Sequence, residues 1–385
     1  MKSAMDDRER VGSEGILRPR ICLPTARQFS RLAFQCGHLE AQDVLTECDN
    51  VDLVCLEAEP GFQRKRQWVR RLMYRDISRR LAFVNPGLKR VRIERYYDLF
   101  VIMCQTYWDF LYVNAIDGWK DHCKVSICWI DELWASSLPH YKYWLSSLRR
   151  FDHVVVGMHG TVTPLSDAIG RKCHYVPGGV DAIRFSPYPK PPERVIDVYS
   201  VGRRSEGVHQ ALLKHAARNE IFYQYDTLQN GESQAPDHRQ HRDLYANTAK
   251  RSRFFIVAPG KANVGEETQG QSEVGFRYYE GSVAGSVLIG QAPECQPFRE
   301  MFDWPDALVH VRPDGSDVLE VVSALRTRPE RIREIGRRNA REGMLRHDWV
   351  YRWKRILEIA GLRPAPGMER REKRLRELFE CARTH

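Results

Sequence analysis

The chain has 385 residues, 42% of them hydrophobic, and a formal net charge of +10. One hydrophobic core rarely serves more than about 250–300 residues, so this length predicts two domains. No stretch approaches the roughly 18 apolar residues of a membrane span, and the charged N-terminus lacks the apolar segment of a secretory signal. Together these features argue against an integral membrane protein and against a secreted one.

The cysteines and the charge distribution narrow the class further. The ten cysteines form no CxxC pair and several fall inside apolar segments, which predicts buried reduced thiols in a cytoplasmic protein and no metal site. Residues 62–96 hold twelve Lys or Arg against two acidic residues, so the remainder is near neutral. A general polyanion-binding protein spreads its charge more widely, and nucleic acid is not an expected partner.

The basic segment has helical spacing. Apolar residues recur every three or four positions over residues 64–80, with arginines on the other face, which predicts an amphipathic helix. Arg70, Arg71 and Arg75 are the candidates to contact an anionic membrane surface or an acidic acceptor. The alternative is a solvated arginine face over an ordinary core stripe.

Strands and helices alternate in the first half of the chain, after a disordered leader expected over residues 1–19. The predicted strands cover residues 21–23, 51–57, 98–104, 124–130, 151–156 and 173–176. The predicted helices cover residues 27–37, 64–80, 108–119, 141–150 and 163–170. This alternation predicts a parallel, doubly wound sheet.

A stiff linker with four prolines follows at residues 185–195, and the alternation then restarts. The predicted strands cover residues 196–201, 221–225, 254–258, 287–289 and 308–311. The predicted helices cover residues 208–217, 243–249, 276–284, 317–326, 329–345 and 347–361. We therefore expect two Rossmann-like domains, at residues 20–187 and 188–345, and a final helix and tail at residues 346–385.

Two doubly wound domains leave a cleft between the carboxyl ends of their strands, where such folds bind ligands. Four motifs are expected there: a strand end with Gly202, Arg203 and Arg204, a glycine turn at residues 177–181, a helix with Arg277, Glu280 and Gly285, and the acidic pair Asp131 and Glu132. The glycine admits close backbone approach, and the arginine fork suits a diphosphate. Each oxygen of the Glu280 carboxylate can accept one hydroxyl proton of a ribose diol; the alternative is a solvated helix residue.

The order and spacing of these motifs resemble the GT-B glycosyltransferases, in particular the family-4-like and spore-maturation-type members of glycosyl transferases group 1. The segment P-x-G-V-D-x-x-x-F-x-P matches Pro177 to Pro187, and the V-G-R strand end matches Val201 to Arg203. The R-x-x-E-x-x-x-x-G helix matches Arg277 to Gly285, and the closing W-x-x-R helix matches Trp349 to Arg352. The resemblance covers residues 150–361 well and the first 150 only through the fold.

The resemblance implies that the first domain holds the acceptor, that the second binds a nucleotide-sugar, and that a C-terminal helix crosses back to the first. Glu280 would bind the ribose, Arg203 the diphosphate, and the loop from Glu273 to Arg277 the sugar. The donor-binding residues implied are Gly202, Arg203, Arg204, Gly275, Phe276, Arg277 and Glu280. No metal or other cofactor is implied, because arginines and helix N-termini can stabilise the leaving diphosphate.

The chain departs from the family pattern at several positions. Ser272 stands where the earlier of two paired glutamates is expected, with Glu273 one position later, and Val208 and His209 stand near an expected lysine. The resemblance favours retention of the anomeric configuration over inversion, with Glu273 as a catalytic candidate. In an inverting enzyme, Asp131 or Glu132 would deprotonate the acceptor hydroxyl; the alternative is a capping acid beside a surface acid.

The sequence therefore predicts a metal-independent glycosyltransferase in the cytoplasm or at the inner face of a membrane. Its donor would be UDP- or GDP-linked, and its acceptor a glycan, a glycolipid or a small molecule. The alternative is a non-catalytic GT-B-fold protein that binds a nucleotide or a polyanion, which the departures from the pattern favour and which Arg203, Arg277 and Glu280 oppose.

Overall fold

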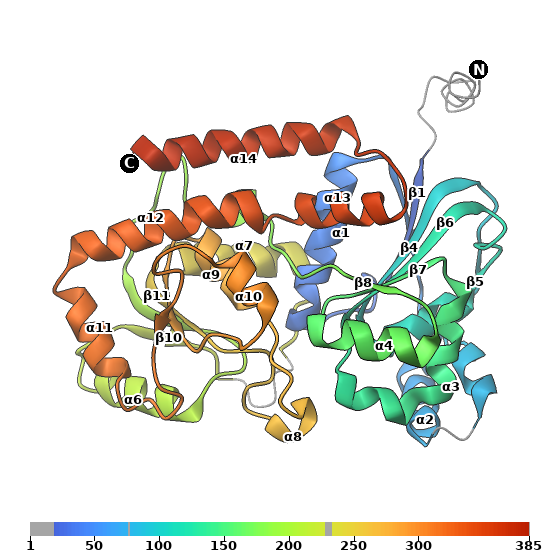
Figure 1. The fold of residues 1–385 in the computed structure, drawn as a ribbon, viewed down its shortest axis with the longest axis horizontal. Helices are drawn as coiled ribbons and strands as arrows, with labels where there is room; N and C mark the ends of the chain where they lie inside the picture. The colour runs from blue at the N-terminus through green and yellow to red at the C-terminus, as the bar shows by residue number, and fades with distance from the viewer. Residues whose placement is uncertain (1–18, 76–77, 228–232, 385) are drawn as a thin grey trace.

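A computed structural model describes residues 19–75, 78–227 and 233–384, and it confirms two α/β units built on parallel sheets (Figure 1). Nearly all of the predicted leader lies outside the described residues. The N-terminal unit has six strands in the order β2-β1-β4-β6-β7-β8. Its strands are β1 (Ile21–Thr25), β2 (Val51–Cys55), β4 (Tyr97–Thr106), β6 (Cys123–Glu132), β7 (His153–Val156) and β8 (Cys173–Tyr175).

The C-terminal unit has five parallel strands in the order β10-β9-β11-β12-β13. They are β9 (Ile196–Ser200), β10 (Tyr223–Tyr225), β11 (Ser252–Val257), β12 (Val287–Gly290) and β13 (Val309–His310). The strands β3 (Val91–Arg92) and β5 (Ile116–Asp117) pair outside both sheets. In both sheets the central strands are apolar and buried, because helices cover both faces.

The helices of the N-terminal unit are α1 (Cys36–Cys48), α2 (Phe62–Tyr74), α3 (Lys142–Leu145) and α4 (Val162–Ile169). Those of the linker and the C-terminal unit are α5 (Ala182–Phe185), α6 (Glu206–Ala216), α7 (His238–Lys250), α8 (Gly265–Thr268), α9 (Phe276–Val283), α10 (Gln296–Met301), α11 (Val318–Arg326) and α12 (Pro329–Arg346). The last helices are α13 (Trp349–Ile359) and α14 (Pro366–Thr384). Within the described ranges, no helix combines the length and apolarity needed to cross a bilayer.

The helix predicted at residues 27–37 is wrong. The chain turns there, and the first helix, α1, begins only at Cys36 and runs to Cys48. This helix is buried on almost every side, because it lies between the two units and under α13 and α14 (Figure 1). A helix buried all round shows no amphipathic period, and its polar residues have partners that lie far away in the sequence.

Two further predicted helices are mostly short 3₁₀ segments. Residues 108–119 form η3 (Asp109–Ala115) and the strand β5, and residues 141–150 are divided among η4 (Ala135–Tyr141), α3 and η5 (Ser146–Arg150). Pro139 lies inside η4. The aromatic rings of Tyr107, Trp108, Tyr141 and Trp144 pack on one another there, so tertiary packing sets these segments more than helix propensity does.

One hydrophobic core extends from one unit into the other. Helix α13 crosses back to the N-terminal sheet, as expected, and the ring of Trp353 lies 5.4 Å from that of Trp129 on β6. Trp353 Nε1 donates a hydrogen bond of 2.7 Å to the Ala41 carbonyl of α1. Backbone hydrogen bonds join Val180 of the glycine turn to His347 (3.0 Å) and to Trp349 (3.1 Å). The two units are therefore joined through α13 and through this turn.

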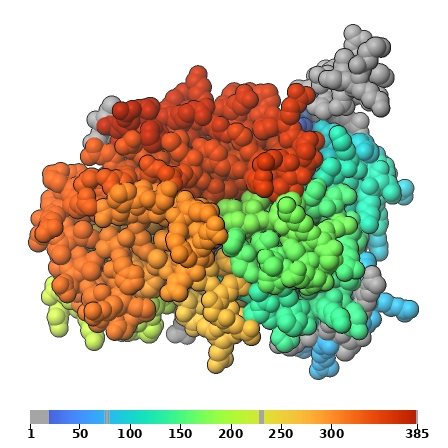
Figure 2. Space-filling model, viewed as in Figure 1, coloured from blue at the N-terminus to red at the C-terminus, as the bar shows by residue number. Residues whose placement is uncertain are grey.

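The C-terminal tail is a docked helix. Helix α14 lies over α12 and α1, and Figure 2 shows the last helices covering the upper edge of both units. Arg371 of α14 is buried and contacts both carboxylate oxygens of Asp348, at 2.8 and 2.9 Å. It also pairs with Asp181 of the glycine turn and, at 3.2 Å, with Glu47 of α1. One guanidinium thus joins the tail, the glycine turn and α1.

We expect Arg371→Met to lower the free energy of unfolding by about 3–5 kcal/mol, because it leaves the buried carboxylates of Asp348 and Asp181 without their cation. Chemical denaturation followed by circular dichroism measures this loss. Arg374→Met is the matched control on the same helix. Its exposed pair with Glu377 contributes about 0–1 kcal/mol. Equal losses in the two variants would show that Arg371 does not hold the tail in place.

Candidate active site

The loops at the carboxyl ends of the two sheets meet each other. From the N-terminal unit come the loops after β4, β6 and β7, and from the C-terminal unit those after β9 and β11. The Ser136 hydroxyl donates to the Glu267 carbonyl at 2.6 Å, and the Ala135 backbone N–H donates to the Gln271 side chain at 3.0 Å. The segment that carries α8 therefore bridges the units at the lower edge of the molecule (Figure 1).

The turn after β9 has the conformation that its glycine suggests. Gly202 has a φ of +68°, in the left-handed region, and open space where a side chain would lie. Its N–H donates to Asp226 at 2.6 Å, and Arg204 pairs with the same carboxylate at 3.0 Å. Arg277 of α9 donates to the carbonyls of Val201 and Arg203. Arg204 and Arg277 thus hold the turn in place.

Arg203 is the arginine of this turn that is left for a ligand. Its side chain is exposed, and it forms no ion pair within the part of the chain that the structure describes. Its charge acts on Glu267 of α8. A hydrogen bond from Lys261 and the charge of Arg203 together lower the pKa of Glu267.

Lys261 was missed by sequence reasoning. It follows β11 in a left-handed turn and contacts Glu267 at 2.8 Å and Glu132 of the other unit at 3.2 Å. Its Nζ lies 5.4 Å from the centre of the Trp134 ring. A lysine after a Pro-Gly at a strand end was the available signal. Arg203 and Lys261 thus both act on Glu267.

Phe276, at the start of α9, enters the space between the units. A Cβ on Gly178 would lie 3.0 Å from its ring, and one on Gly37 would lie 3.4 Å from it. The glycine turn at residues 177–181 therefore faces α9, and Gly178 is needed because a side chain would collide with Phe276. Gly275, the N-cap of α9, has an extended backbone and contacts little.

Glu273 has hydrogen-bond partners in both units, and its catalytic role stays a prediction. It is buried, and its carboxylate accepts hydrogen bonds from the backbone N–H groups of His159 (3.1 Å) and Gly160 (2.8 Å) and from Gln271 (2.7 Å). These amides begin η6 (His159–Thr161) of the N-terminal unit. Glu273 thus joins the two units by capping a helical turn, and its oxygens are occupied.

Glu280 also has partners within the chain. It is buried, one oxygen accepts from Arg242 at 2.5 Å, and the other accepts from Tyr245 at 2.7 Å. Both partners lie on α7, more than thirty residues earlier in the chain. The R-x-x-E spacing placed Glu280 on the correct helix but gave no sign of this partner. The ribose contact stays a prediction.

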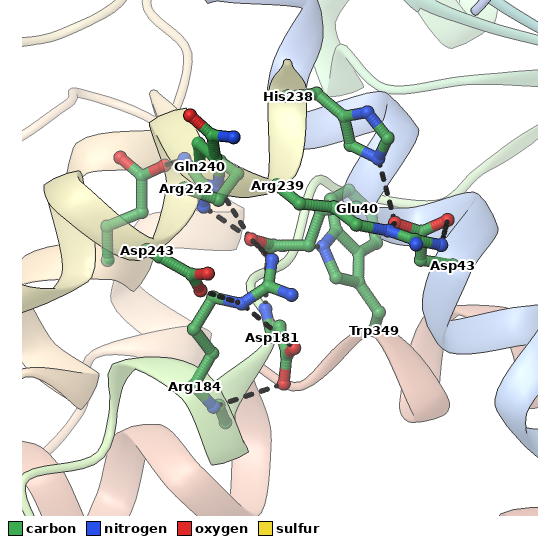
Figure 3. Close-up of polar contacts among 12 residues, drawn as sticks. Glu40, Asp43, Asp181, Arg184, His238, Arg239, Gln240, Arg242, Asp243 and Trp349 are labelled. Atoms are coloured by element: carbon green, nitrogen blue, oxygen red, sulfur yellow. Dashed lines mark hydrogen bonds and ion pairs between the residues drawn. The ribbon is translucent and has the colours of Figure 1, made fainter.

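Arg242 joins Glu280 to a second buried carboxylate, that of Glu40 on α1. Figure 3 shows the contact between Arg242 and Glu40. Its guanidinium contacts the two oxygens of Glu40 at 2.6 and 3.2 Å. Glu40 also accepts from the Asp181 N–H at 2.6 Å and from Trp349 Nε1 at 3.2 Å, and Arg184 lies 3.5 Å away. Glu40 is 0% exposed, so it is a structural group at the interface of the units.

The charges of this cluster shift each other's protonation. Burial raises the pKa of the Glu40 carboxyl, and the Arg242 charge opposes that rise without cancelling it. Burial lowers the pKa of Arg242, but Glu40 and Glu280 outweigh it and raise that pKa above its usual range. One turn along α1, burial opposes the ionisation of Asp43, but hydrogen bonds from His238 and Arg239 hold its pKa well below the usual range.

The two acidic residues at the end of β6 have different surroundings. Glu132 pairs with Lys261 at 3.2 Å and accepts a hydrogen bond of 3.0 Å from Trp134 Nε1. Asp131 turns inward, where Gln105 donates to it at 3.3 Å and the Nε2 of His38 lies 3.2 Å from its Oδ2. Sequence reasoning missed His38, because its helix was not predicted. A histidine close to Asp131 is visible only in the folded chain.

The predicted basic helix forms as α2, over Phe62–Tyr74. Arg70, Arg71 and Arg75 are exposed, and so is Trp68, with 61% of its surface accessible. Val69 and Met73 are buried on the other face, so both the arginine face and the core stripe exist. Arg66 of α2 pairs with Asp109 at 3.4 Å, which connects this helix to the loop after β4.

The comparisons with known proteins agree with this architecture. Residues 203–358 match the family described as glycosyl transferase-like. An α-glucosyltransferase solved with UDP and a 13-mer DNA containing a central A:G mismatch has a TM-score of 0.53 at 11% identity, covering 89% of this chain and 99% of that one. The same enzyme with UDP-glucose and DNA containing an abasic site gives a TM-score of 0.51 at 10% identity, with the same coverage of both chains.

A glycosyltransferase from Rickettsia africae ESF-5 has a TM-score of 0.48 at 10% identity, covering 89% of this chain and 97% of that one. No curated protein matches the chain in sequence. The fold is GT-B, and the family match lies in the C-terminal unit and α13.

We expect Arg242→Met to destabilise the protein by about 3–5 kcal/mol at neutral pH, because two buried carboxylates lose the cation between them. The folded state of the variant binds protons more readily than the unfolded state, since the pKa of Glu40 is raised above its ordinary 4.5. Stability therefore rises as the pH falls toward that value, and the deficit shrinks in acid. Urea denaturation at about pH 8 and about pH 5 measures this.

Arg239→Met on the same helix is the control for this variant. Arg239 is largely exposed, and Asp43 keeps His238 and Arg27 as partners, so a loss of about 1 kcal/mol or less is expected. A deficit in Arg242→Met that does not change with pH would contradict the buried-carboxylate account.

Proposed function

We propose that the chain is a glycosyltransferase that moves a sugar from a UDP-linked donor to a hydroxyl of a glycan, a glycolipid or a small molecule. The observation that carries the proposal is the exposed Arg203 beside Gly202 at the end of β9, with Lys261 near enough that both cations lower the pKa of Glu267. Two cations there suit a diphosphate, whose charge grows as it leaves. The proposed reaction accordingly needs no metal.

The nucleobase of the proposed donor, uracil, is chosen from the similar structures. The α-glucosyltransferase is described in complex with UDP and with UDP-glucose. We extend that choice to this chain as part of the proposal, and GDP is the alternative. Arg204 and Arg277 serve by holding the turn of Gly202, and Phe276 separates the donor loop from α1.

The rival function is a non-catalytic nucleotide-binding protein of the same fold. It is favoured by one observation: the carboxylates of Glu273 and Glu280 are occupied by partners within the chain. An enzyme of this kind needs those groups to rearrange or to act only as scaffolding. Donor cleavage separates the two functions, whereas nucleotide binding is common to both.

The first test is the melting temperature with UDP, GDP, ADP, TDP and CMP. A ligand that binds only the folded state stabilises it by about 2.7 kcal/mol at a hundred times its Kd, so we expect UDP to raise the melting temperature. Arg203→Ala should weaken UDP binding by about 10- to 100-fold, the effect of losing a hydrogen bond to a charged group. Arg203 is exposed, so this variant keeps the fold.

Arg218→Ala is the matched control for Arg203→Ala. Arg218 is also exposed but follows the end of α6, at the opposite edge of the sheet. UDP affinity should be unchanged there. No shift with any nucleotide, or equal loss in both variants, would remove the proposed donor site.

We also propose that α2 docks the enzyme on the anionic inner face of a membrane, where a lipid-linked acceptor would lie. Arg70, Arg71 and Arg75 supply the charge, and Trp68 supplies an exposed ring of the kind that enters the lipid interface. Each basic residue near such a surface contributes about 1 kcal/mol. The link from Arg66 to Asp109 places α2 beside the loop that follows β4.

Sedimentation with vesicles of phosphatidylserine and phosphatidylcholine tests this surface. Reversal of Arg70, Arg71 and Arg75 to Glu should abolish binding and leave circular dichroism unchanged. Reversal of Lys214, Arg218 and Arg328, three exposed residues of the C-terminal unit, should leave binding intact. Equal binding by both triple variants would refute the proposal. Tight binding to duplex DNA with a steep salt dependence would assign α2 to nucleic acid.

A further inference from the structure

Asp226 lies beside the turn of Gly202, at the carboxyl end of the second sheet. It directly follows β10, which pairs in parallel with β9 so that Tyr225 is opposite Ser200. Its Oδ2 accepts the backbone N–H of Gly202 at 2.6 Å. The carboxylate therefore contacts the same turn that the proposed donor site uses.

This arrangement has a counterpart in doubly wound folds that bind dinucleotides. There, a glycine turn after the first strand lets the backbone approach the diphosphate, and an acidic residue about 20 positions further on binds a ribose hydroxyl. In this chain Asp226 follows Gly202 by 24 positions, and β9, the turn, α6 and β10 precede it in the same order. The topology thus places a carboxylate where a ribose next to the proposed diphosphate site would lie.

The carboxylate of Asp226 can accept further hydrogen bonds. Among the residues that the structure describes, Gly202 donates to Oδ2 and Arg204 donates to Oδ1 at 3.0 Å, whereas the two oxygens together offer about four acceptor sites. The side chain is 21% exposed. Open space also lies where a side chain on Gly202 would be, so a ligand hydroxyl can approach the turn and the acid together.

Glu280 is the other carboxylate considered for the ribose, and it is much less accessible. Its side chain is 4% exposed, and Arg242 and Tyr245 of α7 lie against its two oxygens. To reach a ribose, Glu280 would have to leave Arg242, which also compensates the buried carboxylate of Glu40. Breaking a buried ion pair of this kind is costly, so Asp226 is the carboxylate that a ribose reaches without rearrangement.

The charges around Asp226 suit a neutral diol. Arg204 pairs with the carboxylate and donates to the Asp226 carbonyl at 2.8 Å, so the negative charge is partly compensated. Arg203, the residue after Gly202, is exposed and carries the charge that a diphosphate requires. A carboxylate repels phosphate oxygens but accepts hydroxyl protons, so the ribose is the part of the nucleotide that fits Asp226.

We propose that Asp226 binds the ribose hydroxyls of the donor nucleotide, and that Glu280 serves instead to fix α9 to α7. This inference rests on the proposed function. The turn of Gly202 then holds two adjacent parts of the donor, with Arg203 at the diphosphate and Asp226 at the ribose. A site of this kind discriminates between ribonucleotides and deoxyribonucleotides, because only the ribonucleotide supplies both hydroxyl protons.

Titration calorimetry of the whole chain with UDP, 2′-deoxy-UDP and 3′-deoxy-UDP tests the assignment. The unaltered protein should bind at least one deoxy analogue about 10- to 100-fold more weakly than UDP, the effect of losing a hydrogen bond to a charged group. In Asp226→Ala the three ligands should bind equally. A residue that only held the turn would weaken all three by the same factor and leave their ratio unchanged. Asp226→Asn, which keeps an acceptor for the Gly202 N–H, should shrink the same ratio if the alanine variant does not fold.

Asp197→Ala is the matched control. Asp197 also pairs with an arginine, Arg253 at 2.9 Å, and accepts a backbone N–H, that of Phe222 at 2.9 Å, but it lies at the amino end of β9. It should leave all three affinities unchanged. Equal binding of UDP and both analogues by the unaltered protein, an unchanged ratio in a folded Asp226 variant, or the same loss in Asp197→Ala would overturn the assignment. Failure of the unaltered protein to bind UDP would instead overturn the proposed function.

Discussion

The structure depends on a buried ionic bridge between its two units. Arg242 of α7 contacts Glu40 of α1 on one side and Glu280 of α9 on the other, and all three side chains are shielded from water. Charges in such a place are expensive to leave unpaired, so each fixes the position of the others. The bridge ties the helix that carries the predicted ribose-binding glutamate to the helix that carries His38. This guanidinium therefore helps to set the relative position of the two units.

A second set of contacts joins the two units near the carboxyl ends of their strands. Glu273 caps η6 across the interface, and Lys261 reaches Glu132. At the back, α13 packs Trp353 on Trp129, and Arg371 of α14 holds Asp348 and Asp181. Many two-domain enzymes close around a substrate by hinge motion. In this chain several buried pairs of side chains join the two units, so a hinge motion between the units would have to break some of these pairs.

The acidic residues between the two units have two kinds of environment. Glu40, Glu273 and Glu280 are satisfied by partners within the chain, which suits positioning. Asp131 instead faces a histidine whose other nitrogen is free. Lys261 pairs with Glu132 and Glu267, and Arg203 is exposed.

The sequence by itself determined the alternation of strands and helices, the two parallel sheets, the turn of Gly202 and the returning helix of Trp349, because these follow from local periodicity and backbone conformation. It also placed Arg203 and Glu280 on the correct elements. Only the tertiary structure decided what their side chains contact. Helix α1 is buried all round and has no amphipathic period, so neither it nor His38 was visible as a feature. Arg242, Glu40 and Glu280 come from three helices, and their pairing depends on distances in the folded chain, which no spacing along the sequence encodes.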